Sequence, residues 1–186
     1  AALERLRAGD RAQGALLAVA CLAALAAPHL AGFRPRMDLV HYNLARIAEA
    51  GGRPEQAALH DREALRLDPS SFLPHLTLGS RAARGGDLDR ALAHLRRAAA
   101  LEPRSPEVWS NLGGVYLARG DLERARRALE RALALDPASL PAVHNLALLA
   151  ARAGDLARAR ALNRRALALD PRHPAARRLA ARLGER

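Results

Sequence analysis

A triplet of leucine, an acidic residue and proline recurs four times in this chain, at a fixed interval of 34 residues. The copies begin at Leu67, Leu101, Leu135 and Leu169. Glycine keeps the same interval, at Gly52, Gly86, Gly120 and Gly154. A period near 34 residues is typical of arrays of helix–turn–helix units, so the interval predicts an all-α fold of repeated helix pairs.

Each period contains its own start and stop signals. The repeats span 38–71, 72–105, 106–139 and 140–173, and each predicts two amphipathic helices. The glycine ends the first helix, because it adopts positive φ without a steric penalty. Aspartate follows this glycine in three of the four repeats and is expected to cap the second helix. The proline of the triplet then prevents that helix from continuing.

The first helix carries a small residue where a neighbouring backbone can approach closely. The repeats place Ala45, Gly79, Gly113 and Ala147 at this position. Late in the second helix, Leu95 and Leu129 of the middle repeats are replaced by Asp61 and Asn163 in the outer ones. We therefore expect the first and fourth repeats to pack less tightly there.

The chain resembles the tetratricopeptide repeat family, and the third repeat carries the fullest match. Its matching residues are Trp109, Leu112, Gly113, Tyr116, Gly120, Asp121, Ala125, Leu129, Ala132 and Pro137. The resemblance implies a helical-repeat solenoid, a right-handed superhelix of antiparallel helix pairs. We expect one apolar helix before it and a capping helix over 174–186, beginning at Pro174.

The first 37 residues do not keep the period. An N-terminal flank (1–11) is followed by residues 12–33, which contain no formal charge. This segment is long enough to span a bilayer as one apolar helix. Two alternatives are a helix packed on the first repeat and the core of a secretion signal. A span predicts a membrane-associated protein whose side of the membrane is undecided. A packed helix instead predicts a soluble protein of the cytoplasm or periplasm.

The net charge is +11, and every basic residue is arginine. An alanine-, leucine- and arginine-rich chain without lysine indicates a GC-rich bacterial genome, which accounts for part of this charge. Residues 1–37, 38–173 and 174–186 contribute +3, +5 and +3. Acids alternate with arginines along the helices, so we expect no nucleic-acid partner.

No catalytic constellation is present in the sequence. It has no phosphate-cradling glycine loop, no zinc-type cysteine spacing and no nucleophile elbow. The seven histidines never fall three or four residues apart, so one helix face cannot present a metal-binding pair. The sequence predicts a non-enzymatic chain with no cofactor and no metal.

A binding groove is the better candidate, because the first helices of such arrays line one continuous surface. Asn43, Asn111 and Asn145 share one repeat position there, with Thr77 completing the column. Side-chain amides can pair with the backbone of an extended peptide regardless of its sequence. An equally open alternative is that they are ordinary helix residues. The other groove candidates are Tyr42, Arg46, Ser80, Arg84, Ser110, Leu117, His144 and Arg152.

These observations predict a protein–protein interaction scaffold that binds a partner protein or extended peptide in its groove, tethered to a membrane by residues 12–33. Arg46, Arg84 and Arg152 favour an acidic partner. Two alternatives stay open. The chain could be the C-terminal repeat tail of a polytopic bacterial membrane enzyme, such as a glycosyltransferase, or a self-assembling array that forms homo-oligomers.

Overall fold

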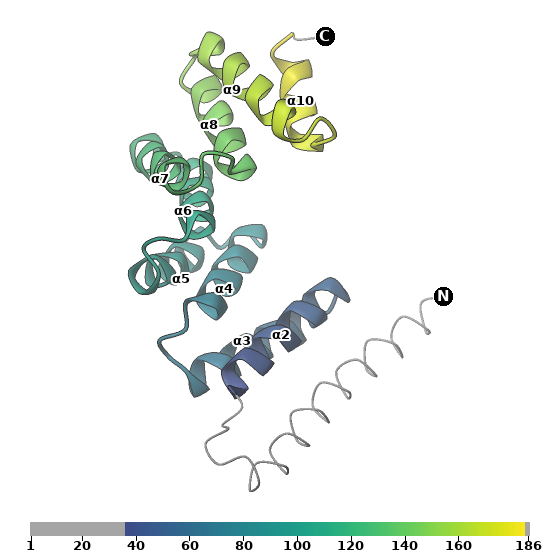
Figure 1. Ribbon diagram of the computed structural model, residues 1–186, viewed down its shortest axis with the longest axis vertical. Coiled ribbons are helices and arrows are strands. Elements are labelled where there is room, and N and C mark those ends of the chain that lie inside the picture. Colours follow the sequence, from purple (N-terminus) through teal and green to yellow (C-terminus); the bar gives the residue numbers. More distant parts are fainter. Residues whose placement is uncertain (1–35, 185–186) are drawn as a thin grey trace, which may run out of the picture. The chain divides into compact units, whose positions relative to one another are not determined.

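The computed structural model describes residues 36–184, and these residues form helices joined by short turns (Figure 1). The chain divides into two compact units, Ala1–Leu78 and Gly79–Arg186, and the division falls inside one helix, α4. The helices are α2 (Met37–Ala50), α3 (Pro54–Leu67), α4 (Phe72–Arg84), α5 (Leu88–Leu101), α6 (Pro106–Arg119), α7 (Leu122–Leu135), α8 (Leu140–Arg152), α9 (Leu156–Leu169) and α10 (Pro174–Arg182).

The predicted stop and start signals act as expected. Gly52, Gly86, Gly120 and Gly154 all have positive φ, between 70° and 85°. The aspartate after the last three of these glycines accepts a hydrogen bond from the backbone N–H three residues on, at Arg90, Arg124 and Arg158. The second helices end at the leucine of the triplet. Local chemistry therefore marks the turn between the two helices and the end of the second helix in these repeats.

In the first unit, α2 packs against α3. Small side chains form the seam, since Ala45 and Ala48 of α2 meet Ala57 of α3 in one buried cluster. Asp61 of α3 is also fully buried. The seam is narrow because alanine brings the two helix backbones close together.

In the second unit, α6 packs on α7, α8 packs on α9, and α6 also contacts α8. One cluster of buried side chains joins α6, α7 and α8 around Leu117, Leu129 and Leu146. A second cluster joins α8 and α9 to the region of α10, where Leu179 and Leu183 cover Ala147 and Ala159. The predicted cap at 174–186 thus contains α10, whose apolar side closes this core.

The predicted apolar helix over 12–33 lies outside the described residues. Within 36–184, no helix is both long and apolar enough to cross a membrane.

Candidate peptide-binding cleft

An open cleft of about 320 Å³ lies in the second unit, between the C-terminal part of α4 and helices α5, α6 and α8. We call it the Asn111–Asn145 cleft. Its lining residues are Ser80, Ala83, Arg84, Leu88, Leu95, Ser110, Asn111, Gly114, Val115, Ala118 and Asn145. Five of these are residues that the sequence predicts for the groove, namely Ser80, Arg84, Ser110, Asn111 and Asn145.

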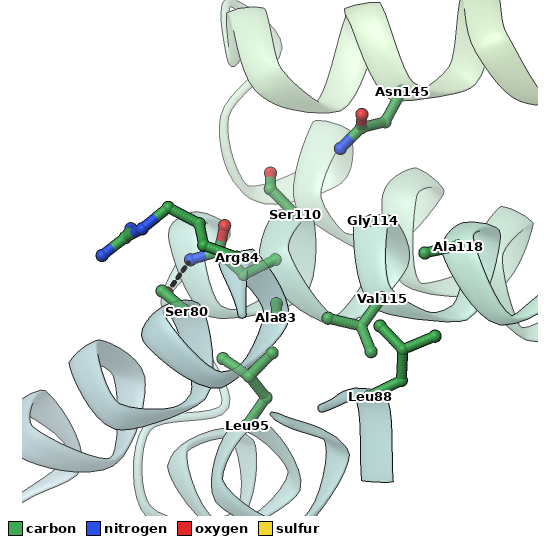
Figure 2. A pocket seen from close by; sticks show the side chains of 11 residues that line it. Ser80, Ala83, Arg84, Leu88, Leu95, Ser110, Gly114, Val115, Ala118 and Asn145 are labelled. Carbon is green, nitrogen blue, oxygen red and sulfur yellow. Dashed lines mark hydrogen bonds between the residues drawn. The ribbon is translucent and has the colours of Figure 1, made fainter. Parts of the chain in front are cut away.

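The two asparagines are held in different ways. Asn111 Nδ2 donates a hydrogen bond to Ser80 Oγ at 3.1 Å, which ties α6 to α4 (Figure 2). Asn145 lies over Gly114, because a Cβ atom built on that glycine would stand 3.2 Å from Asn145 Nδ2. Glycine at 114 therefore leaves the space that the Asn145 amide occupies. An amide held in this way can offer a donor and an acceptor to a peptide backbone.

The floor of the cleft is apolar, and its polar groups are few. Leu95 and Val115 are buried below the opening, whereas Ala118 is exposed. Ser110 is itself buried, with its hydroxyl 3.3 Å from that of Ser139, so it serves the packing of the protein. Figure 2 shows the Arg84 guanidinium extending away from the other labelled side chains. Apolar surface with a few fixed polar groups suits a peptide segment.

Arg152 lies in a separate pocket of about 260 Å³, lined also by Leu148, Ala151, Leu179 and Arg182. Its Nη1 donates to the backbone oxygen of Leu117 near the end of α6. The side chain that the sequence assigns to ligand contact thus also bridges α6 and α8.

The structure places two other predicted groove residues in the interior. Leu117 is 4% exposed and belongs to the α6–α7–α8 core, because its side of α6 faces the neighbouring helices. His144 is 9% exposed, and its ring contacts His173 edge-on, with ring centroids 5.2 Å apart. Neither residue lines the cleft.

The remaining candidates belong to the first unit. Asn43 and Arg46 are exposed on α2, one turn apart, and Tyr42 is half-buried. Thr77 donates its hydroxyl to the backbone oxygen of Pro74 at 3.0 Å, a bond within its own helix. Of the predicted column, the structure brings Asn111 and Asn145 to one cleft.

A contact between histidines of different helices escapes prediction from the sequence. His41 Nδ1 of α2 lies 3.1 Å from His60 Nδ1 of α3. Burial lowers the pKa of His60, and His41 and Arg53 lower it further. A search for spacing along one helix cannot find a pair of this kind. Among residues 36–184, no three His, Cys, Asp or Glu side chains are grouped to hold a metal ion.

Residues 82–151 match the family described as Tetratricopeptide repeat. No curated protein matches the chain in sequence. A chain of the "APC/C hetero-tetramer Cut9-Hcn1" aligns with 80% of this chain at 22% identity and a TM-score of 0.73. This chain spans 30% of that one's length.

Two further solved structures align with this chain over a larger share of their own length. The pilF protein of Pseudomonas aeruginosa aligns with 81% of this chain and 69% of its own, at 26% identity and a TM-score of 0.72. YrrB, described as "a TPR protein with an unusual peptide-binding site", aligns with 96% of this chain and 87% of its own, at 18% identity and a TM-score of 0.67. Residues 82–151 are thus similar to the tetratricopeptide repeat family, and the solved structures share the helical-repeat fold of this chain.

Proposed function

We propose that this chain is a non-catalytic scaffold that binds a segment of a partner protein in the Asn111–Asn145 cleft. The observation that carries the proposal is the convergence of Asn111, Asn145 and Ser80 above an apolar floor. Two further facts support it. Arrays of stacked helical repeats present extended binding surfaces, and the similar protein YrrB has a peptide-binding site.

The proposed ligand is one that matches the chemistry of the cleft. The amides of Asn111 and Asn145 can pair with the backbone of an extended segment, and small apolar side chains can rest on Leu95 and Val115. Arg84 at the margin favours an acidic residue in that segment. The proposed partner is therefore an extended, mixed apolar and acidic stretch of another protein.

Photo-crosslinking in the native host tests the location of binding. A photoreactive amino acid at Ala118, exposed in the cleft, is expected to capture a protein partner. The same amino acid at Ala134, exposed on α7 and outside the cleft, is the matched control and should capture nothing in common with it. Identical products from both positions would contradict the proposal.

A purified partner segment then allows a test of the asparagines. The double variant N111A/N145A should weaken binding by about fivefold or more, because two hydrogen bonds of about 0.5–1.5 kcal/mol each are lost. N43A removes the same residue from the same column in the other unit, and we expect it to leave binding unchanged. Unaltered binding by the double variant would place the ligand elsewhere.

We also propose that residues 12–33 tether the scaffold to a membrane, since they form a 22-residue uncharged stretch. Detergent-phase partition of the intact chain should disappear when residues 1–37 are deleted. An intact chain that stays wholly in the aqueous phase would contradict the tether while leaving the cleft proposal untouched.

A further inference from the structure

The positive charge of this chain is concentrated at its C-terminal end. Residues 38–155 contain 16 arginines and 15 acidic residues, so this long stretch is nearly neutral. Residues 156–186 contain nine arginines and two acidic residues.

Helices α7 and α9 allow a direct comparison, since they occupy the same register one repeat apart. The same six positions are exposed on both. On α7 they hold Glu123, Arg124, Arg127, Glu130, Arg131 and Ala134. On α9 they hold Ala157, Arg158, Ala161, Arg164, Arg165 and Ala168, which we call the α9 face.

Two of the four arginines of α7, Arg126 and Arg127, lie close to glutamates of the same helix. Glu123 pairs with Arg126 at 3.0 Å and lies 3.8 Å from Arg127, and Glu130 lies 3.7 Å from Arg126. Helix α9 contains no acidic residue, because alanine and arginine replace the two glutamates. Its surface charge is therefore balanced by no carboxylate of the same helix.

The acidic residues at the two ends of α9 each accept a hydrogen bond from a backbone N–H. Asp155 accepts a hydrogen bond from the Arg158 backbone N–H at 2.9 Å. Asp170 accepts one from the Arg172 backbone N–H, also at 2.9 Å. Both carboxylates thus serve the helix ends, while α10 adds the exposed residues Arg177, Arg178 and Arg182.

We propose that the α9 face binds the surface of a bilayer that contains anionic lipids. The exposed alanines Ala157, Ala161 and Ala168 lie among its arginines, of which Arg165 also donates to the backbone oxygen of Pro137. Leu169, one turn beyond Arg165, is 42% exposed and can enter the interfacial region. Residues 156–184 contain no Phe, Tyr or Trp on which a base could stack, which disfavours single-stranded nucleic acid. The cleft uses other helices, so this proposal does not depend on it.

Vesicle co-sedimentation of the full chain tests the proposal. Zwitterionic phosphatidylcholine vesicles measure the binding that needs no lipid charge, including any insertion of residues 12–33. Vesicles with about one third phosphatidylglycerol add the electrostatic part, which should fade as salt shortens the screening length. The difference in binding between the two kinds of vesicle measures the contribution of the lipid charge.

The matched variants are R158Q/R165Q on α9 and R124Q/R131Q on α7, which remove equal charge at equal register. Each arginine near an anionic surface contributes roughly a fivefold increase in partition, so the α9 variant should lose about tenfold or more of the anionic component. The α7 variant should lose less than about twofold, because its arginines lie on a helix that carries its own carboxylates. Circular dichroism checks that both variants keep their helices.

Several outcomes would overturn the proposal. Equal losses in the two variants would mean that net charge alone drives binding, and an unchanged α9 variant would exclude the α9 face. A single-stranded RNA oligonucleotide or polyglutamate that binds more tightly at the same ionic strength, with the same dependence on Arg158 and Arg165, would identify a different polyanion as the ligand.

Discussion

The third and fourth repeats pair their two helices in the same way, but different residues meet at one contact between those helices. In α6–α7, glycine at 113 faces Leu129, and a Cβ atom on that glycine would stand 2.5 Å from Leu129 Cγ. In α8–α9, the equivalent residues are Ala147 and Asn163. Leu129 and Asn163 are both fully buried, so the two repeats fill the same position with different chemistry.

Across the repeats, the small residue of the first helix and the buried residue late in the second helix vary together. Gly79 also pairs with Leu95, whose Cγ would lie 2.6 Å from an added Cβ. The first repeat combines Ala45 with Asp61, as the fourth combines alanine with asparagine. Glycine therefore accompanies the branched leucine, and alanine accompanies a planar polar side chain. The fourth repeat therefore buries polar atoms that make no hydrogen bond, because Asn163 Oδ1 and Nδ2 have no hydrogen-bond partner among the described residues.

The largest expected effect is the loss of the leucine. L129A should lower the free energy of unfolding by about 2–5 kcal/mol, because a fully buried side chain leaves a cavity between α6 and α7. Urea denaturation followed by circular dichroism measures it. N163A, the matched change in α9, should shift stability by less than about 1 kcal/mol, since it also removes two unpaired polar atoms. Equal losses would show that the two repeats do not differ as argued.

A methyl group at the close contact should have the next largest effect. G113A brings its Cβ within 2.5 Å of Leu129 Cγ, an atom too near the backbone to move without a change of rotamer. We expect a loss of about 1–3 kcal/mol from overpacking. G114A is the control, because its nearest neighbour is the end of the Asn145 side chain at 3.2 Å. A stabilised G113A variant would mean that the helices separate freely.

Transplanting the pair of the third repeat into the fourth tests the coupling itself. N163L removes a buried amide without partners, yet the Ala147 methyl group should limit the gain. A147G/N163L restores the glycine–leucine combination, and we expect it to be about 1 kcal/mol more stable than the wild-type protein. The double-mutant cycle should give a coupling of at least about 0.5 kcal/mol. Additive effects would show that the two sites are independent.

Much of the fold could be predicted because its signals are local. The positive φ of Gly120, the cap of Asp121 and the end of α7 before Pro137 depend on the residues themselves and their immediate neighbours. The small residue at 113 also predicts a close approach of some kind. That Leu129 faces this position could not be predicted, because it depends on the distance between two helices, and a single sequence does not give that distance.

The candidate site was harder to predict for the same reason. Asn111 and Asn145 share a column by register and do line one cleft. Leu117 and His144 occupy positions on the same helices but turn into the core. A rotation of about 100° per residue separates a lining position from a buried one. The sequence does not reveal the two histidine pairs. His41 and His60 lie on different helices, and His144 lies on α8 whereas His173 lies in the turn after α9.

Acidification should produce the smallest of these effects and act on the fourth repeat through His144. Burial is the main cause that lowers the pKa of His144, and His173 and Arg178 lower it further. The folded state therefore holds this proton less tightly than the unfolded state. Its contribution to stability is full above the unfolded pKa of about 6.5 and declines as the pH falls from there toward the lower folded value.

The variant H144L should flatten this part of the decline, because leucine fills the site and does not titrate. H173S is the control, because His173 contacts the His144 ring and its Nδ1 accepts the Ala176 backbone N–H at the start of α10, where serine keeps a capping oxygen. Unfolding midpoints between about pH 7.5 and about pH 5 should fall less in H144L than in the wild-type protein. An unchanged slope would assign the acid sensitivity to other groups such as His60.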